Sequence, residues 1–142
     1  MTERALVVDA SVVVEYLVEL RLTEHATRLF RTLERKPELE LWAPDILYVE
    51  CVSALRRLVL AKEIPRRAGE ERVGKLLRLP LTIAKSGPLM GGVWEQCSAM
   101  TAYDACYAEL ARTLEAPLVT ADAKLARVHA ARGGKVALLS AL

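Results

Sequence analysis

Short apolar segments alternate with amphipathic helical segments along the chain, and this alternation limits the fold more than any other feature. The clearest segment is Ala5–Val8, an apolar run that ends in Asp9. A second is Leu118–Thr120, which leads within two residues into Asp122. Continuous apolar runs rich in β-branched residues indicate strands that are buried on both faces. We therefore expect a mostly parallel sheet that is covered by helices on both sides.

The remaining segments extend this pattern over residues 1–142. Helices are expected where apolar residues recur at spacings of three and four, and strands where short apolar runs lie between turn residues. After a first helix that follows Ser11, the expected helices cover 23–35, 44–62, 66–77, 101–114 and 122–132, and the further strands cover 39–42, 79–84 and 136–139. The weakest helix prediction is 89–99, because it contains Gly91 and Gly92. The fold prediction is one α/β domain, a three-layer α/β/α sandwich around a five-stranded parallel sheet.

Composition supports a folded cytoplasmic protein. The 142 residues are 53% hydrophobic and 27% charged, which is typical of a globular domain and not of a disordered chain. No apolar run is long enough to span a membrane, and the N-terminal residues lack a secretory pattern. Three cysteines without metal-site spacing indicate free thiols in a reducing compartment. His25 and His129 are expected to be solvated because their helical surroundings are polar.

Two acids lie where interior elements of the C-terminal half begin or end. Thr101 is the expected N-cap of a helix whose apolar stripe has Asp104 at its edge. The stripe consists of Tyr103, Cys106, Tyr107, Leu110 and Leu114. Asp122 follows the buried strand 118–120 almost directly. A purely structural interpretation is available, since Thr101 and Asp104 resemble a capping box and Asp122 suits an N-cap.

Two further acids occupy similar positions in the N-terminal half. Asp9 ends the first strand, and Glu50 lies on a helix between Ile46 and Ala54. In parallel α/β sheets, ligands bind outside the carboxyl ends of the strands, where the strand order reverses. Right-handed crossovers can bring helix starts to the same rim. We therefore expect Asp9, Glu50, Asp104 and Asp122 to line one pocket, although Glu50 alone would more often be a partly exposed side chain.

Four neighbouring carboxylates indicate a bound cation. Without one they repel each other and some take up protons. An oxygen-only donor set favours Mg²⁺ or Mn²⁺ over zinc, and such ions in acidic pockets serve phosphoryl chemistry. The chain has no Gly-rich GK[ST] loop, and Asp9 is followed by Ala10 and Ser11 instead of the Asp-x-Asp of an aspartyl-phosphate phosphatase. The number of ions, one or two, does not follow from the residues.

Basic residues are candidates for contact with phosphate. The net charge of +2 is too small to indicate nucleic-acid binding by itself, and basic pairs ordinarily mark solvated helix faces. Arg56, Arg57 and Lys124 are the candidates we select, because such charges bind a phosphate backbone without reading its sequence.

Three segments together carry a resemblance to a known family. They read VVDASVVV at 7–14, PDILYVECVSAL at 44–55 and TAYDACYAELARTLEAPLVTADAKL at 101–125. In order and spacing they resemble the motifs of the PIN-domain family, in particular VapC-type toxins of toxin–antitoxin pairs, over nearly the whole chain. The resemblance implies a five-stranded parallel sheet and an acidic active site with Asp9, Glu50, Asp104 and Asp122 at its four acidic positions. It also implies supporting roles for Ser11 and Thr120, which would orient a carboxylate or a water.

The resemblance implies a divalent-metal-dependent endoribonuclease that hydrolyses single-stranded RNA with Mg²⁺ or Mn²⁺. Its implied partners are a second copy of the chain, in a homodimer or larger assembly, and a cognate antitoxin whose C-terminal segment fills the acidic groove. One alternative is a PIN-domain nuclease of RNA processing, which the lack of an adjacent antitoxin gene would indicate. Another is a receiver-like phospho-acceptor domain that binds Mg²⁺, for which the strand 79–84 offers no acceptor Asp and only Lys85 fits. A non-catalytic RNA-binding module is disfavoured by the intact set of acids.

Overall fold

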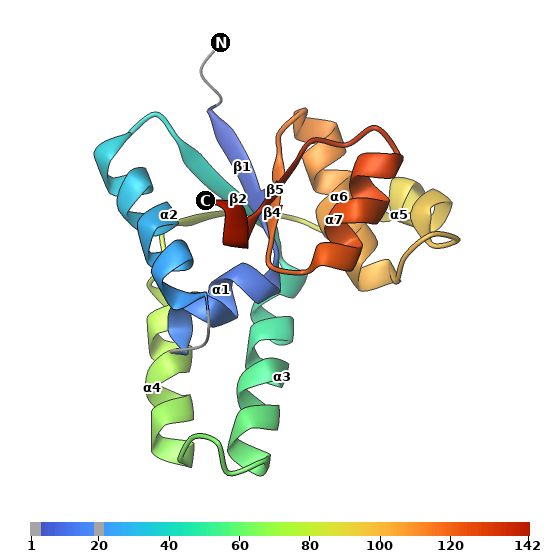
Figure 1. The fold of residues 1–142 in the computed structure, drawn as a ribbon. Coiled ribbons are helices and arrows are strands. Elements are labelled where there is room, and N and C mark those ends of the chain that lie inside the picture. The colour runs from blue at the N-terminus through green and yellow to red at the C-terminus, as the bar shows by residue number, and fades with distance from the viewer. Residues whose placement is uncertain (1–3, 19–21) are drawn as a thin grey trace.

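The computed structural model of the chain describes residues 4–18 and 22–142, in which strands alternate with helices (Figure 1). The strands are β1 (Ala5–Val8), β2 (Glu40–Pro44), β3 (Leu81–Ala84), β4 (Leu118–Thr120) and β5 (Val136–Leu138). The helices are α1 (Ala10–Leu17), α2 (Thr23–Arg35), α3 (Ile46–Leu60), α4 (Arg66–Leu77), α5 (Met90–Gln96), α6 (Ala102–Leu114) and α7 (Ala123–Ala131). Two 3-10 turns, η1 (Gly87–Leu89) and η2 (Leu139–Ala141), complete the described elements.

The five strands form one parallel sheet in the order β3-β2-β1-β4-β5. The chain moves outward from β1 to β3 and then crosses back to place β4 on the other side of β1. In the pairing of β1 with β4, Val7 lies opposite Leu118 and Val8 lies opposite Val119. The strand order therefore reverses between β1 and β4, and their carboxyl ends mark the point where α/β sheets bind ligands.

Helices cover both faces of the sheet, which confirms the predicted three-layer sandwich. Figure 1 shows α1 and α2 on one side and α5, α6 and α7 on the other, while α3 and α4 form a hairpin that extends beyond the sheet. Helix α6 packs on β1 and β2, and α7 packs on β4 and β5. The central strand β1 ends in two fully buried residues, Val7 and Val8, at 0% exposure. The site therefore rests on a rigid interior strand.

Two local predictions were wrong, and the weakest helix prediction was confirmed. Pro44 ends β2 instead of opening a helix, and it lies opposite Ala84 of the edge strand β3. Its missing N–H is tolerated at the last position of the strand. Tyr103, placed in the apolar stripe, is 64% exposed because the helix turns it away from the core. The double-glycine segment does form a helix, α5, over Met90–Gln96.

The prediction for one of the two histidines was also wrong. His129 is 4% exposed, because the chain after α7 folds back over its ring. Gly134 donates its N–H to the His129 carbonyl at 2.9 Å, and a Cβ at Gly134 would overlap the imidazole. The turn is permitted by Gly133, whose φ of 86° suits glycine. The three cysteines are free, as predicted. In the described part of the chain, no helix has the length and apolar character needed to cross a bilayer.

Candidate functional site: an acidic pocket at the carboxyl end of the sheet

Asp9 lies where β1 ends and α1 begins, and its carboxylate is held from several sides. It is 5% exposed and is the N-cap of α1, accepting from the Val12 N–H at 3.3 Å. The Ser11 hydroxyl donates to Oδ1 at 2.5 Å, and the Thr120 hydroxyl donates to Oδ2 at 2.6 Å. Each carboxylate oxygen therefore has its own hydroxyl donor, and its orientation is determined by the fold.

The same two hydroxyls connect Asp9 to the loop that follows β4. The Ala121 N–H donates to the Ser11 hydroxyl oxygen at 3.0 Å. The Asp122 N–H donates to the Thr120 hydroxyl oxygen, also at 3.0 Å. The structure therefore joins the ends of β1 and β4 through Ser11 and Thr120, which were the two supporting residues of the sequence prediction.

Glu50 reaches the pocket from α3 and is half-buried. The Tyr107 hydroxyl, from α6, donates to Glu50 Oε1 at 2.6 Å. Tyr107 is 1% exposed, so the ring belongs to the core while its hydroxyl meets the pocket. The sequence had assigned Tyr107 only to the apolar stripe.

Asp104 and Asp122 approach from the N-terminal ends of α6 and α7. The Asp104 N–H donates to the Thr101 hydroxyl, which confirms Thr101 as the N-cap. The Asp104 carboxylate has no ion pair to any residue of the described ranges. The Thr101 hydroxyl and the charge of Lys124 only partly offset the rise in its pKa. Asp122 does cap α7, because its Oδ1 accepts from the N–H groups of Lys124 and Leu125. The structural interpretation is thus correct for Asp122, which nevertheless also lines the pocket.

These side chains line one cavity of about 620 Å³, here called the acidic pocket. It brings together the four predicted acids and Ser11, and Thr120 lies directly behind Asp9. Among the described residues, its charged lining consists of the acids Asp9, Glu15, Glu50, Asp104 and Asp122 and the single base Arg57. Of the other basic candidates, Lys124 lies close enough to Asp104 to lower its pKa, and Arg56 is exposed and outside the lining.

Three acids of the pocket, Asp9, Glu50 and Asp104, resist ionisation in the absence of a cation. Burial raises the pKa of Asp9 to about 6, against the opposing hydrogen bonds from Ser11 and Thr120, and the Asp104 charge raises it further. Burial also raises the pKa of Glu50, which the Tyr107 hydrogen bond lowers and Asp104 raises. Burial raises the pKa of Asp104, and the charge of Asp122 adds to that rise. Each of these carboxyl groups therefore gains from a positive charge in the pocket.

The donor set fits a hard divalent cation. All four predicted ligands are carboxylates, which favour Mg²⁺ or Mn²⁺ over softer ions. Within residues 4–18 and 22–142, no three His, Cys, Asp or Glu side chains are grouped tightly enough to contact one ion together. Mg²⁺ is commonly bound through one or two carboxylates and keeps several waters. A hydrated ion held by part of this set is therefore compatible with the geometry.

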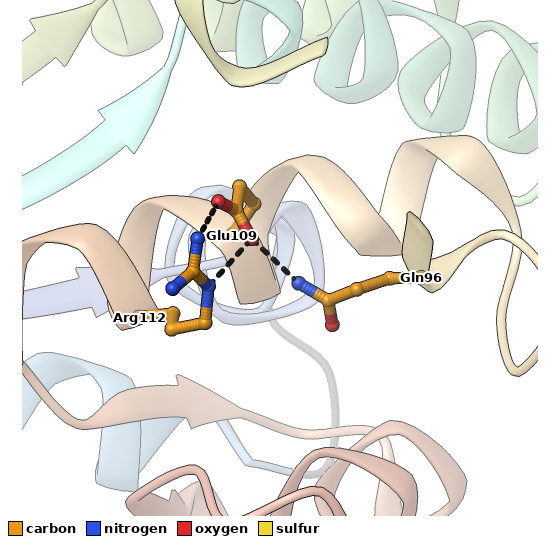
Figure 2. A network of polar contacts seen from close by, with 3 residues as sticks. All are labelled: Gln96, Glu109 and Arg112. Carbon is orange, nitrogen blue, oxygen red and sulfur yellow. Dashed lines mark hydrogen bonds and ion pairs between the residues drawn. The ribbon is translucent and has the colours of Figure 1, made fainter. Parts of the chain in front are cut away.

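A second cavity, of about 950 Å³, lies near the other end of α6 and is here called the balanced cavity. Glu109 of α6 is 5% exposed and pairs with Arg112, whose Nε donates to Oε2 at 2.9 Å. Gln96 of α5 donates to the same oxygen at 2.8 Å, and Figure 2 shows both partners converging on the Glu109 carboxylate. The charged lining residues are Glu95, Glu109, Glu115, Arg112, Arg132 and Lys135, so that three acids meet three bases.

Sequence reasoning missed Tyr107 and Glu109 as polar partners. Tyr107 follows Asp104 by three residues, and this helical spacing was the available signal that its hydroxyl lies near the same pocket. Glu109 and Arg112 also have helical spacing, but nothing in the sequence shows that Glu109 is buried under α5. That burial depends on the approach of α5 at Gly92, where a Cβ would overlap the Glu109 carboxyl.

Comparison with known proteins identifies the family over nearly the whole chain. A family model described as the PIN domain matches residues 6–131. Ribonuclease VapC3 of Mycobacterium tuberculosis is 32% identical over 123 residues, which cover 85% of this chain and 85% of that protein. Ribonuclease VapC1 of the same organism is 39% identical over 88 residues, which cover 59% of this chain and only 64% of that protein. The matched segment thus spans less than two thirds of VapC1.

Solved structures share the fold. The structure of PAE2754 from Pyrobaculum aerophilum superposes with a TM-score of 0.72 at 20% identity, covering 96% of this chain and 84% of that chain. At this identity the similarity concerns the arrangement of the elements and not the chemistry of their side chains.

Proposed function

The chain belongs to the PIN-domain family, and from that premise we propose that it is a divalent-metal-dependent endoribonuclease, the toxin component of a VapBC-type pair. Residues 1–142 form one nuclease domain in this proposal. Its support from relatives is that VapC1 and VapC3 are named ribonucleases. Its support from the structure is the acidic pocket at the point where the strand order reverses.

The observation that carries the proposal is the excess of negative charge in the acidic pocket. Within the described part of the chain, five acids line it with one base, and neither of the ion pairs found there involves a pocket acid. A fold would gain stability by pairing or replacing such groups. Their retention near the ends of β1 and β4 is explained if a cation and a phosphodiester occupy the pocket.

We assign the cation, Mg²⁺ or Mn²⁺, to Asp9, Asp104 and Asp122, with Glu50 as a further ligand or as the group that orients a water. Because no three described acids are close enough to contact one ion together, some of them would hold it through its waters. When bound, a hard divalent cation neutralises the carboxylates, orients the phosphodiester and favours ionisation of the attacking water. The chain itself supplies the geometry. Asp9 is held at the end of β1. Asp104 lies in the first turn of α6, and Asp122 is the N-cap of α7.

Ser11 and Thr120 act as positioning residues for Asp9. Their hydroxyls donate to its two oxygens and accept from the backbone of the loop after β4. Because each hydroxyl proton is committed to Asp9, a rotation of the carboxylate would break two hydrogen bonds. These contacts keep the remaining lone pairs of Asp9 directed toward the pocket.

The substrate is RNA, whose phosphates require positive charge, which the lining within residues 4–18 and 22–142 supplies only at Arg57. Arg57 and Lys124 lie close enough to pocket acids to lower the pKa of Glu50 and of Asp104, respectively, so both are placed to meet a bound backbone. Arg56 extends this basic surface along α3. Such contacts supply affinity that falls with salt but does not select a sequence.

The proposed partners follow from the VapC relationship. They are a cognate antitoxin, which would cover the acidic pocket, and a second copy of the chain in a homodimer or larger assembly. The cytoplasm is the proposed compartment, in keeping with three free cysteines. The phospho-acceptor alternative is set aside, because Lys85 follows the edge strand β3 and does not line the acidic pocket.

The test is RNA cleavage with defined controls. Structured and unstructured RNAs are incubated with the purified chain in Mg²⁺, in Mn²⁺ and in excess chelator, and the product ends are mapped. We expect cleavage of single-stranded regions at defined positions only when a metal is present. Cleavage that persists in chelator, or no cleavage with either ion, would contradict the proposal.

A further inference from the structure

Tyr107 combines a core ring with a hydroxyl that serves the acidic pocket. The residue is 1% exposed, and its hydroxyl is the one polar atom of its side chain. That hydroxyl donates to Glu50 Oε1 at 2.6 Å, within the usual range for a hydroxyl–carboxylate hydrogen bond. Because a carboxylate oxygen can only accept, the phenol is the donor to Glu50.

Glu50 depends on this contact more than the other acids depend on any single partner. Across residues 4–18 and 22–142, the Tyr107 hydroxyl is the sole hydrogen-bond donor to its carboxylate. Asp9, in contrast, has two hydroxyl donors and a backbone N–H. Glutamate has one more rotatable bond than aspartate, and its helix α3 extends away from the sheet (Figure 1).

We propose that Tyr107 is a positioning residue of the nuclease, which holds the Glu50 carboxylate in the acidic pocket and thereby aligns α3 with the acids of α6. This inference rests on the proposed function. Tyr107 lies one helical turn after Asp104 on α6, so one rigid helix presents Asp104 directly and places Glu50 through the phenol. The hydroxyl supports the geometry of the site and does not contact the substrate.

The test removes one oxygen atom. Tyr107→Phe keeps the buried ring and deletes the donor to Glu50. Tyr16→Phe is the matched control, because Tyr16 stacks on Phe30 with ring centroids 4.3 Å apart and its hydroxyl has no hydrogen bond to the described residues. Thermal unfolding checks that both variants fold. Two quantities are then measured for each: kcat and KM for single-stranded RNA, and the Kd for Mn²⁺ by electron paramagnetic resonance.

We expect Tyr107→Phe to lower kcat or weaken Mn²⁺ binding by about 10-fold to 100-fold, the range typical of residues that orient a ligand. A loss of Mn²⁺ affinity would mean that Glu50 holds the ion. A loss of kcat at unchanged Mn²⁺ affinity would mean that it orients the water. In either case the KM for RNA stays within about twofold, and Tyr16→Phe matches the wild type.

A double-mutant cycle with Glu50→Ala, which removes the acceptor of the Tyr107 hydroxyl, distinguishes positioning from general packing. If Tyr107 acts through Glu50, Tyr107→Phe changes both quantities less than about twofold in the Glu50→Ala background. Residual rates are resolved with the enzyme in excess over RNA and long incubation. The inference is overturned if Tyr107→Phe equals the wild type, or if it causes the same loss with and without the Glu50 carboxylate. A wild-type chain that does not cleave RNA contradicts the proposed function itself, so the two failures are distinct.

Discussion

Helix α6 carries two carboxylates, five residues apart, whose surroundings are opposite. Asp104 opens toward the acidic pocket and has no ion pair within the described ranges. Glu109 lies under α5, where Arg112 and Gln96 hold both of its oxygens (Figure 2). The acidic pocket has five acids against one base in its lining, whereas the balanced cavity has three against three.

The difference appears in the acidity of the two groups. Burial raises the pKa of Asp104, and Asp122 adds to the rise. The hydrogen bond from Arg112 lowers the pKa of Glu109, against the effect of burial. A buried carboxylate with its own cation contributes to the fold, while one without a cation is available to an external ion. The larger of the two cavities is thus the less suitable as an active site.

The largest expected effect comes from removing one uncompensated charge. Asp104→Asn should abolish metal-dependent RNA cleavage, a fall in kcat of about a thousand-fold, equal to about 4 kcal/mol of barrier. The metal-free chain should unfold at an equal or higher temperature, since the substitution relieves repulsion with Asp122. Cleavage rate and thermal unfolding in chelator are the two measurements. Retained cleavage, or loss of folding at unchanged specific activity, would show that Asp104 has a structural role like that of Glu109.

The next effect is a pH dependence of the free energy of unfolding, which has opposite sign for Asp9 in the acidic pocket and Glu109 in the balanced cavity. The pKa of Asp9 is about 6 in the fold against an ordinary 3.8, so the folded chain binds this proton more tightly than the unfolded chain. The associated stability, about 3 kcal/mol, is present below about pH 4 and is lost as the pH rises through about 6. Glu109 behaves oppositely, because its pKa lies below the ordinary 4.5, and its contribution is lost as the pH falls through that lowered value.

Urea unfolding in chelator between about pH 4 and 7 measures this difference. Asp9→Asn should reduce the decline in stability that accompanies a rise in pH, leaving the part that comes from Glu50 and Asp104, whereas Glu109→Gln should leave the decline intact. Saturating Mg²⁺ or Mn²⁺ should reverse the wild-type slope, because the ion competes with protons for the same oxygens. If stability fell with pH as steeply in Asp9→Asn as in the wild type, the fold would not raise the pKa of Asp9.

Adjacent glycines of α5 provide a third test, on the side of the balanced cavity. A Cβ at Gly92 would overlap the Glu109 carboxyl, whereas a Cβ at Gly91 meets no atom within 4 Å. Gly92→Ala should therefore destabilise the chain by about 2 kcal/mol, because it displaces Glu109 from its partners. Gly91→Ala should stabilise it by up to about 1 kcal/mol, because alanine favours a helix. Chemical unfolding at neutral pH measures both changes in the free energy of unfolding. If the two substitutions changed it equally, the Glu109 side chain would be free to move away from a Cβ at position 92.

The same glycines show where sequence reasoning succeeded and where it could not. Buried strands such as Ala5–Val8 were predictable because continuous apolar runs have few other uses, and the parallel order followed from their alternation with helices. The gathering of Asp9 and Asp122 at one rim followed from strand ends alone. Gly91 and Gly92 lowered the expectation of a helix, because glycine disfavours one. The reason for a glycine at position 92 is its close approach to the Glu109 side chain, seventeen positions along the chain, and the sequence does not show that contact.

Contacts between distant elements account for the other errors. The hydroxyl of Tyr107 looked like part of an apolar stripe, because its partner Glu50 is 57 positions away. His129 looked solvated, because the sequence does not show that Gly134 returns over its ring. Periodicity reports which face of a helix is buried, but it does not report which polar atom of a buried residue finds a partner across the core.

The smallest expected effect completes the comparison on α6 and mirrors the first. Glu109→Gln keeps the shape of the buried side chain and its contact with Gln96 but removes the charge that pairs with Arg112. We expect a loss of about 1 kcal/mol in the free energy of unfolding, because Arg112 keeps its charge but loses the opposite charge and one of its two acceptor oxygens. Specific activity per folded molecule, measured with Mn²⁺ and RNA, should stay at the wild-type level. If Glu109→Gln instead lowered cleavage as Asp104→Asn is expected to do, the two ends of α6 would share one catalytic role, and the division between acidic pocket and balanced cavity would be wrong.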